Sequence, residues 1–263
     1  MATIPLADGW LHYEATGDGP PLLLVPGLGG IGSFWQQQAA DFARDFRVIV
    51  HDHRGCGRSS RSRIAYSVEQ MAADLLCLMD ALGIAAADFV GHSTGGAIGQ
   101  IIAQDRPERV QRLVLSASWA GPDPYIRRSF AARRELLRLG GVASYWRASV
   151  LLLRPPYWIS ANDAALQAEE ARLLADPPDA AILDSRIDAV LRFDRRAQLG
   201  RIRAPTLVVT AADDMVTPPH YAEELAETIP GATLVMLPQG GHFAPVIEAA
   251  AYNRVVGGFL RTA

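Results

Sequence analysis

The chain has 263 residues, of which 49% are hydrophobic and 20% are charged, and its formal net charge is −3. This composition is that of a globular protein with a sizeable core. The basic residues, all of which are Arg, are scattered along the chain, so neither nucleic acid nor a membrane is expected as a partner. The two cysteines, Cys56 and Cys77, have no spacing typical of a metal site or a redox motif, and we expect reduced thiols.

The shortness of the apolar segments predicts a cytoplasmic location. Residues 1–10 include Asp8 and lack the apolar stretch of a secretory signal. No apolar run approaches the ~20 residues that span a bilayer. The longest candidate near the middle of the chain, Leu151–Leu153, stops at Arg154. The oligomeric state cannot be read from the sequence.

Short apolar runs bounded by Gly, Pro or Asp alternate with helical patterns along the chain. The runs are rich in Val and Leu and do not alternate strictly with polar residues, which is typical of strands buried on both faces of a parallel sheet. They predict strands at Leu22–Val25, Val48–Val50, Phe89–Val90, Leu113–Leu115, Leu207–Val209 and Leu234–Leu237. The fold class is therefore α/β, with a mostly parallel central sheet flanked by helices.

Between the second and third of these strands, the sequence predicts a helix. Ser67 and Gln70 have the spacing of a capping box. Apolar residues follow at helical spacing from Met71 to Leu82, and Gly83 is placed to end the helix.

One long stretch, residues 121–200, contains helical patterns and no buried strand. The patterns cover Ser129–Leu139, Ala164–Ala175 and Ala180–Leu191. We therefore expect a core formed by residues 1–120 and 201–263, with residues 121–200 inserted as a helical lid (cap). The alternative is a helical layer that only adds to the core.

The strongest motif runs from Gly91 to Gly96 and centres on Ser93. It follows a predicted strand and opens a predicted helix, which is the context of a nucleophile elbow. Such a serine occupies a strained turn, where a side chain at Gly91 or Gly95 would collide with neighbouring backbone. A similar string also occurs in ordinary Gly-rich turns, so the interpretation depends on catalytic partners elsewhere in the chain.

Candidate partners follow Ser93 in the chain order acid, then histidine. His242 lies in a Gly-Gly-His loop after the last predicted strand, and an imidazole is suited to take the serine proton near neutrality. Asp213 and Asp214 both follow the Leu207–Val209 strand, and an acid there would orient the imidazole. The residue pattern leaves both open. A structural role is expected for the other histidines: His12, His51, His53, His92 and His220.

An acyl-transfer site also needs backbone donors for the oxyanion of the tetrahedral intermediate. The N–H of Thr94 follows the nucleophile, and the N–H of Leu28 lies in the Gly-rich turn after the first predicted parallel strand. The turn lacks the spacing of a nucleotide-binding loop. No metal or organic cofactor is expected.

Together these motifs resemble the α/β-hydrolase superfamily over essentially the whole chain. The matching segments are LHYEATGDGPPLLLVPGLGG (11–30), HDHRGCGRSS (51–60), VGHSTGG (90–96), TAADDMVTP (210–218) and QGGHFAP (239–245). In relatives the triad acid precedes two variable residues and a Thr-Pro or similar pair. The resemblance thus implies a catalytic triad of Ser93, Asp214 and His242, with Asp213 as the alternative acid.

Residues 133–162 and 186–209 look like the RutD proteins of pyrimidine degradation, which are assigned to aminoacrylate or carbamate hydrolysis. Some RutD-like proteins have no serine at the elbow, whereas this chain has Ser93. The pattern from elbow to His242 is also similar to 3-oxoadipate enol-lactonases and cofactor-free perhydrolases. The resemblance implies a serine hydrolase acting on a small carbonyl substrate. A lactonase, a general carboxylesterase, and a non-catalytic ligand sensor on the same fold are the alternatives.

The predicted lid contains further candidates for substrate contacts. Four arginines could bind a substrate carboxylate, although a solvated helix face is the expected role for Arg127, Arg128, Arg133 and Arg134. Five aromatic residues could line a pocket or pack the lid onto the sheet: Trp119, Tyr145, Trp146, Tyr157 and Trp158.

Overall fold

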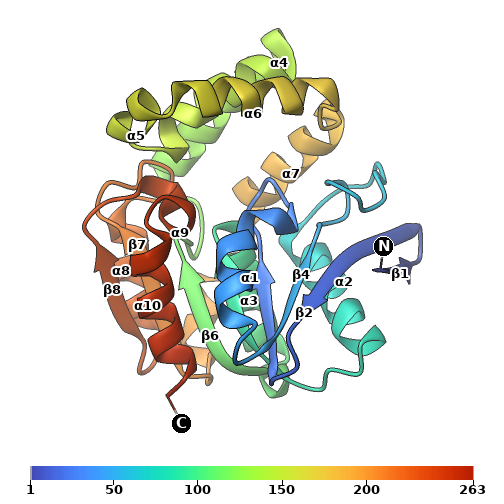
Figure 1. Cartoon of the computed structure of the whole chain (residues 1–263), viewed down its shortest axis with the longest axis vertical. Helices are drawn as coiled ribbons and strands as arrows, with labels where there is room; N and C mark the ends of the chain where they lie inside the picture. Colours follow the sequence, from blue (N-terminus) through green and yellow to red (C-terminus); the bar gives the residue numbers. More distant parts are fainter. Residues whose placement is uncertain (1, 263) are drawn as a thin grey trace.

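The computed structural model describes residues 2–262 and is built around an eight-stranded sheet (Figure 1). The strands are β1 (Ala2–Leu6), β2 (Gly9–Thr16), β3 (Pro21–Val25), β4 (Arg47–His51), β5 (Ala87–His92), β6 (Val110–Ser116), β7 (Thr206–Ala211) and β8 (Thr233–Leu237). Their order across the sheet is β1-β2-β4-β3-β5-β6-β7-β8. Pairing is parallel from β4 to β8, whereas at the other edge β1 pairs antiparallel with β2, and β2 pairs antiparallel with β4.

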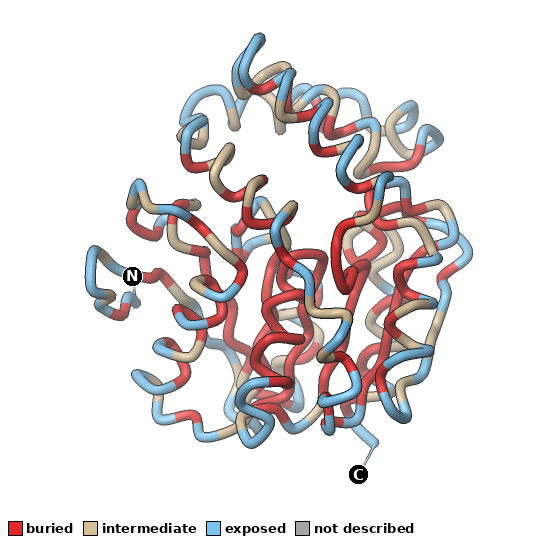
Figure 2. Tube along the Cα trace, turned by 180° about the vertical axis from the view of Figure 1, so that it is seen from behind, coloured by how far each residue is buried: buried red, intermediate tan, exposed pale blue. Residues whose placement is uncertain are grey.

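Helices cover both faces of this sheet. They are α1 (Gln36–Phe42), α2 (Val68–Ala81), α3 (Thr94–Asp105), α8 (Pro219–Thr228), α9 (Ala244–Ile247) and α10 (Ala249–Leu260), with 3₁₀ turns η1 (Gly32–Trp35), η2 (Pro107–Arg109), η3 (Arg196–Arg201) and η4 (Gly241–Phe243). On β3, Leu22 and Leu24 belong to the apolar cluster that includes α1 and α10. Leu23 and Val25 belong to the cluster that includes α2, α3 and α8. Successive side chains of the central strands therefore enter opposite cores, and Figure 2 shows the central strands and α3 as continuously buried.

The six strands expected from Val- and Leu-rich runs are all present, and they form the α/β-hydrolase type of sheet that was predicted. The β1–β2 hairpin at the edge was not predicted from the sequence. Its strands bury only part of one face and contain exposed residues such as Trp10, so they lack a continuous apolar run. The hairpin turns tightly, with Leu6 paired to Gly9.

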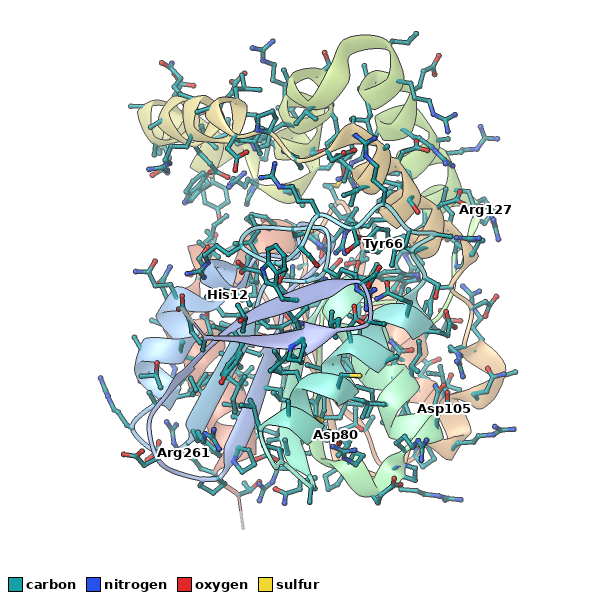
Figure 3. All side chains as sticks on the ribbon, turned by 90° about the vertical axis from the view of Figure 1, so that its right-hand side faces the viewer. His12, Tyr66, Asp80, Asp105, Arg127 and Arg261 are labelled. Atoms are coloured by element: carbon teal, nitrogen blue, oxygen red, sulfur yellow. The ribbon has the colours of Figure 1, made fainter. Side chains whose placement is uncertain are left out.

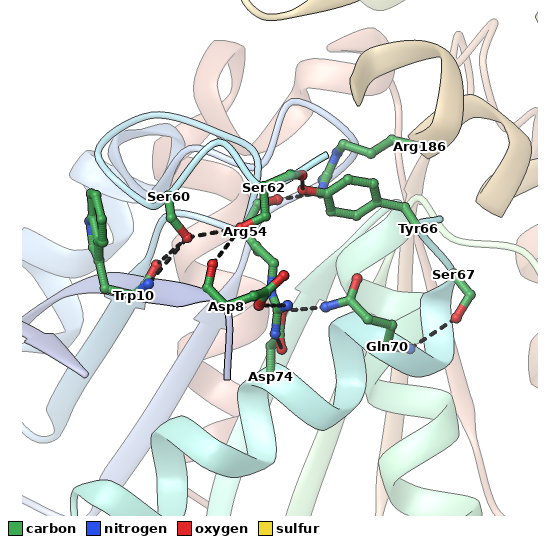
Figure 4. Close-up of polar contacts among 10 residues, drawn as sticks. All are labelled: Asp8, Trp10, Arg54, Ser60, Ser62, Tyr66, Ser67, Gln70, Asp74 and Arg186. Atoms are coloured by element: carbon green, nitrogen blue, oxygen red, sulfur yellow. Dashed lines mark hydrogen bonds and ion pairs between the residues drawn. The ribbon is translucent and has the colours of Figure 1, made fainter. Parts of the chain in front are cut away.

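Helix α2 begins at the expected cap. The Gln70 N–H donates to Ser67 Oγ at 3.0 Å, which is half of a capping box. The Gln70 side chain does not return to Ser67 but donates to Asp74, which also accepts from Arg54 Nε at 3.0 Å (Figure 4). Arg54 contacts Asp8 as well, so this cluster ties α2 and the loop after β4 to the N-terminal hairpin.

Between β6 and β7 lie α4 (Pro124–Leu153), α5 (Pro156–Ala161), α6 (Asp163–Ala175) and α7 (Ala180–Arg192), which we call the helical insertion (Figure 1). The helix expected at Ser129–Leu139 extends further at both ends. It begins after the cap Asp123, and it continues past Gly141, whose φ of 69° makes a kink. Helix α5, which starts at Pro156, was not predicted from the sequence. Assignment of residues 121–200 as a lid remains a prediction.

The described helices include none that is long and apolar enough to cross a membrane.

Candidate active site

The carboxyl ends of the parallel strands carry all the residues predicted for catalysis. Ser93 follows β5, Asp214 follows β7, and His242 follows β8. Leu28 follows β3, which pairs directly with β5. Since β4 and β5 lie on either side of β3, the strand order reverses here, at the kind of position where ligands bind in open α/β sheets.

Ser93 occupies a sharp turn between β5 and α3. Its φ is 54° and its ψ is −118°, a conformation that costs a non-glycine residue about 1–3 kcal/mol. The neighbouring glycines make the turn sterically feasible. A Cβ at Gly91 would lie 2.3 Å from the Gly95 carbonyl oxygen, and one at Gly95 would lie 2.1 Å from that of Val25. The local geometry is therefore that of the predicted elbow.

Asp214 and His242 are hydrogen-bonded to each other. His242 Nδ1 lies 2.9 Å from Asp214 Oδ2, and both side chains are buried. The other oxygen, Oδ1, accepts the N–H groups of Val216 at 2.8 Å and Thr217 at 3.0 Å. Thr217 Oγ1 lies 2.9 Å from Asp214 Oδ2 and 3.0 Å from the Ala117 carbonyl oxygen. The carboxylate is thus fixed in orientation and leaves the imidazole Nε2 available for the serine proton.

Asp213 points to a different part of the same loop. Its carboxylate accepts the N–H of Gly241 at 2.8 Å and that of Gly240 at 3.3 Å. Gly240 and Gly241 have positive φ, 121° and 60° respectively, so the loop that carries His242 needs residues without a Cβ. The structure therefore brings Asp214 to the imidazole and gives Asp213 the role of holding the backbone of the histidine loop.

His242 also contacts a second histidine, which precedes Ser93. The ring centroids of His92 and His242 are 4.7 Å apart. Burial, followed by the neighbouring His242, lowers the pKa of His92 well below its usual value, so this ring is neutral. The Phe34 ring also stacks on His92, with the ring centroids 4.8 Å apart. Within residues 2–262 no hydrogen bond joins Ser93 to His242, and such bonds often tighten only in the substrate complex.

In the predicted oxyanion loop, residues 26–30, two carbonyl groups accept backbone hydrogen bonds, one from within the loop and one from the loop after β4. The Gly27 carbonyl accepts the Gly30 N–H at 3.0 Å, and the Gly30 carbonyl accepts the His53 N–H at 2.7 Å. Neither Leu28 N–H nor Thr94 N–H has a hydrogen-bond acceptor within the described part of the chain. Thr94 is also the first residue of α3, where the helix dipole favours negative charge. The two predicted donors are therefore free to bind an anionic oxygen.

The helical insertion contacts the histidine loop directly. A Cβ at Gly241 would lie 3.0 Å from Pro155 Cδ, and the Arg154 guanidinium lies 4.7 Å from the centre of the Phe243 ring. Ser93 retains 7% of its surface exposed and His242 only 3%. Arg154 was not singled out from the sequence, because its position beside Phe243 depends on how the insertion folds back onto the sheet.

The four arginines considered as carboxylate ligands take different positions. Arg127 and Arg128 are exposed, as expected for a solvated face, and Figure 3 shows Arg127 at the outer surface of the insertion. Arg134 pairs with Asp184 at 2.7 Å and joins α4 to α7. Arg133 is buried instead, donating to Ser149 Oγ at 3.1 Å and Tyr145 OH at 2.7 Å. Of the aromatic candidates, Trp119 is fully packed against Phe193 and Tyr145 is buried inside the insertion, whereas Trp146 and Trp158 are half-buried and Tyr157 is exposed.

A family model described as the alpha/beta hydrolase fold matches residues 20–249. The chain belongs to the α/β-hydrolase family. The expected resemblance of the five core motifs to this family is thereby confirmed, and the elbow, the acid loop and the histidine loop all lie within the matched range.

Individual α/β-hydrolases are similar to this chain over nearly its full length. It is 42% identical over 258 residues to RutD of Caulobacter sp. (strain K31), assigned as a carbamate hydrolase, covering 96% of each chain. It is 41% identical over 251 residues to RutD of Stutzerimonas stutzeri (strain A1501), covering 94% of this chain and 95% of the relative. The structure of the enol-lactonase from Burkholderia xenovorans LB400 matches with a TM-score of 0.91 and 28% identity, over 99% of this chain and 100% of that one.

Proposed function

We propose that this hydrolase cleaves a small carbonyl substrate through an acyl-enzyme formed on Ser93. The observation that carries the proposal is the His242–Asp214 hydrogen bond of 2.9 Å, located beside the elbow that holds Ser93 at a φ of 54°. A free serine hydroxyl is a poor nucleophile, and a positioned imidazole with an orienting carboxylate supplies the base that it needs.

In the first step, His242 Nε2 takes the Ser93 proton while Oγ forms a bond to the substrate carbonyl carbon. The carbonyl oxygen becomes an oxyanion, which the N–H groups of Leu28 and Thr94 would bind. The bond to the leaving group then breaks, and the leaving group receives the proton from His242. In the second half of the cycle, His242 takes a proton from a water molecule, which attacks the carbonyl carbon of the acyl-enzyme. The bond from that carbon to Ser93 Oγ then breaks, and Ser93 recovers its proton from His242.

For the substrate we propose a small carbamate, the bond type named for the RutD relatives, because its carbonyl carbon can form the acyl-enzyme on Ser93. The support is the identity of about 40% to RutD proteins over almost the full chain. The nearly complete burial of Ser93 and His242 favours a small, enclosed substrate over a long acyl chain. An enol-lactone is the second candidate, because the enol-lactonase from Burkholderia xenovorans LB400 has the same fold with 28% identity.

The first experiment compares the hydrolysis of p-nitrophenyl esters from acetate to octanoate by the wild type and by Ser93→Ala. We expect activity on the shortest chains only, and its loss in the variant. Unchanged activity in Ser93→Ala would reject the mechanism. Best activity on six- to eight-carbon chains would instead indicate a general carboxylesterase and reject the RutD-type and lactonase assignments.

A second experiment separates the two small-substrate candidates. Ammonia release from a carbamate and the absorbance change of an enol-lactone are measured with the same enzyme preparation. A higher kcat/KM on the carbamate supports the RutD-type assignment, and a higher kcat/KM on the lactone replaces it. Ser93→Ala serves as the background control for both assays.

A further inference from the structure

Arg186 is a buried cation that reaches from the helical insertion to the oxyanion loop. It lies on α7 and is 1% exposed. Its Nε and Nη2 donate to the Leu28 carbonyl oxygen at 3.2 and 3.0 Å. The N–H of Leu28 is a predicted oxyanion donor. The Arg186 guanidinium therefore donates two hydrogen bonds to the carbonyl oxygen of the same residue.

The remaining contacts of Arg186 fix the guanidinium itself. Nη1 donates to the Arg54 carbonyl oxygen at 3.2 Å, and Nη2 lies 2.8 Å from His53 Nδ1. Burial, followed by the charge of Arg186, lowers the pKa of His53 well below its usual value, so its Nδ1 is an acceptor. The Tyr66 ring lies 5.6 Å from the guanidinium carbon, and Figure 4 shows the two side chains together.

The environment of Arg186 indicates a role other than a salt bridge. No carboxylate within the described residues lies within 4 Å of its guanidinium, whereas most other buried or half-buried arginines of the insertion pair with Asp or Glu, as Arg134 and Arg154 do. A buried charge without a counter-ion is costly. The hydrogen bonds that Arg186 makes to backbone carbonyls of the core must offset that cost.

The glycine-rich composition of the oxyanion loop makes a contact that restrains Leu28 necessary. Gly27, Gly29 and Gly30 surround Leu28, and glycine has the largest conformational freedom of any residue. A Cβ at Gly29 would meet no atom within 4 Å, so this residue faces open space on its Cβ side. Donors for an oxyanion are effective only when they are held in place before charge develops.

We propose that Arg186 is a positioning residue that holds the Leu28 N–H in the geometry required for the oxyanion. Because Arg186 belongs to α7, its hold on the Leu28 carbonyl depends on the helical insertion being seated on the core. The insertion thereby takes part in transition-state stabilisation as well as in covering Ser93. This inference rests on the proposed acyl-transfer function.

The test uses the full chain with Arg186→Met and Arg186→Lys, and Arg192→Gln as a matched control. Arg192 also lies on α7 and donates to a core carbonyl, that of Tyr66 at 3.0 Å, but it does not contact the oxyanion loop. Esterase kinetics on p-nitrophenyl acetate are measured together with inhibition by phenylboronic acid, which forms a tetrahedral anionic adduct with a serine.

For Arg186→Met we expect kcat to fall about 10- to 100-fold, with KM within about threefold of wild type, since the lost interaction acts in the transition state. The inhibition constant of phenylboronic acid should rise by a similar factor. Arg186→Lys, which can still reach one acceptor, should be intermediate, and Arg192→Gln should match wild type. If Arg186→Met does not fold, the kinetics of Arg186→Lys decide.

Two outcomes separate this inference from the proposed function. If a fluorophosphonate labels wild type and not Ser93→Ala, but the folded Arg186 variants keep wild-type kcat and boronate affinity, the positioning role is wrong and the acyl-transfer function stands. A rise in KM at unchanged kcat would also overturn the positioning role. If the fluorophosphonate does not label Ser93 in the wild type, the acyl-transfer function fails, and this inference fails with it.

Discussion

The rings of His92 and His242 lie 4.7 Å apart with their planes tilted by 53°. His92 directly precedes Ser93, the proposed nucleophile, and its side chain was expected to have only a structural role. Its Nδ1 lies 3.3 Å from Ser116 Oγ, and burial keeps its pKa well below the usual value. A neutral ring next to His242 packs against the imidazole without repelling the positive charge that it gains during catalysis.

This arrangement predicts that one proton, not two, inactivates the site on acidification. The acid limb of log kcat/KM against pH should have a slope of one, because buried His92 does not take up a proton in that range. His92→Phe, which keeps a ring beside Phe34, should leave the slope unchanged and kcat within about threefold of wild type. The measurement is a pH–rate profile of both proteins, and a slope of two in wild type that drops to one in the variant would contradict it.

The adjacent acids should differ sharply in their effect on catalysis. Asp214→Asn disturbs the tautomer of His242, so we expect kcat to fall by roughly 10⁴-fold. Asp213→Asn keeps one acceptor for the Gly241 N–H, and we expect a loss of about tenfold or less. Steady-state kinetics of the two variants, with thermal melts to confirm folding, test this. A larger loss in Asp213→Asn would reassign the acid.

Thr217 was not identified from the sequence as more than part of the acid motif, yet its hydroxyl bridges Asp214 and the Ala117 carbonyl. Thr217→Val keeps the shape and removes the hydroxyl. We expect the free energy of unfolding to fall by about 1–3 kcal/mol, because the buried acceptor to which the hydroxyl donates loses its donor. We also expect kcat to fall about tenfold as Asp214 becomes less well oriented.

Thr217→Ser is the matched control, since it restores the hydroxyl and omits only a methyl group. Urea unfolding and esterase kinetics should place it closer to wild type than Thr217→Val in both stability and kcat. Equal kcat in the Ser and Val variants would show that the hydroxyl does not orient the carboxylate.

Gly95→Ala should disrupt the elbow, because the new Cβ would lie 2.1 Å from the Val25 carbonyl oxygen. The backbone cannot yield as a flexible side chain would, so we expect a loss of about 3 kcal/mol or more in the free energy of unfolding. Gly200→Ala, where a Cβ would meet nothing within 4 Å, should stay within about 0.5 kcal/mol of wild type. Urea denaturation of the pair provides the comparison, and equal stabilities would contradict the close approach of β3 and α3.

Buried histidines should make the protein less stable on mild acidification. Burial, partly offset by Asp52, lowers the pKa of His51 to about 4 from its usual 6.5. As pH falls from 6.5 towards 4, the unfolded chain binds a proton that the folded chain does not, so His51 alone removes up to about 3 kcal/mol. His53 and His92 add to this in the same direction.

Urea midpoints between pH 7 and pH 4.5 measure this effect. His51→Gln should show a smaller decrease in unfolding free energy over that range than wild type, whatever its stability at pH 7. An equal decrease in both proteins would show that His51 is accessible to protons in the folded state.

The parallel sheet and the strand-to-loop positions of Ser93, Asp214 and His242 could be predicted from the sequence for a physical reason. Strands buried on both faces give unbroken runs of Val and Leu, and their carboxyl ends converge on one edge of the sheet. The turn at Ser93 has its own local signature, because glycines must flank it. Local patterns of this kind depend on few contacts outside the segment.

The contacts that organise the site were not predictable in the same way. Arg186 and Leu28 are separated by 158 positions in the sequence, and no local pattern relates them. The kink at Gly141 and the start of α5 at Pro156 depend on how the insertion packs. The β1–β2 hairpin was not predicted, because an edge hairpin that buries only part of one face lacks the continuous apolar run of the other strands.

The strained backbone at Ser93 has a consequence for laboratory evolution of this enzyme. With φ at 54° and ψ at −118°, a glycine at this position would relieve strain of about 1–3 kcal/mol while removing the hydroxyl that we propose as the nucleophile. Selection for thermal tolerance alone would therefore enrich inactive chains. Libraries of this protein need a growth or colour assay tied to turnover, because heat resistance and catalysis make opposite demands on the same residue.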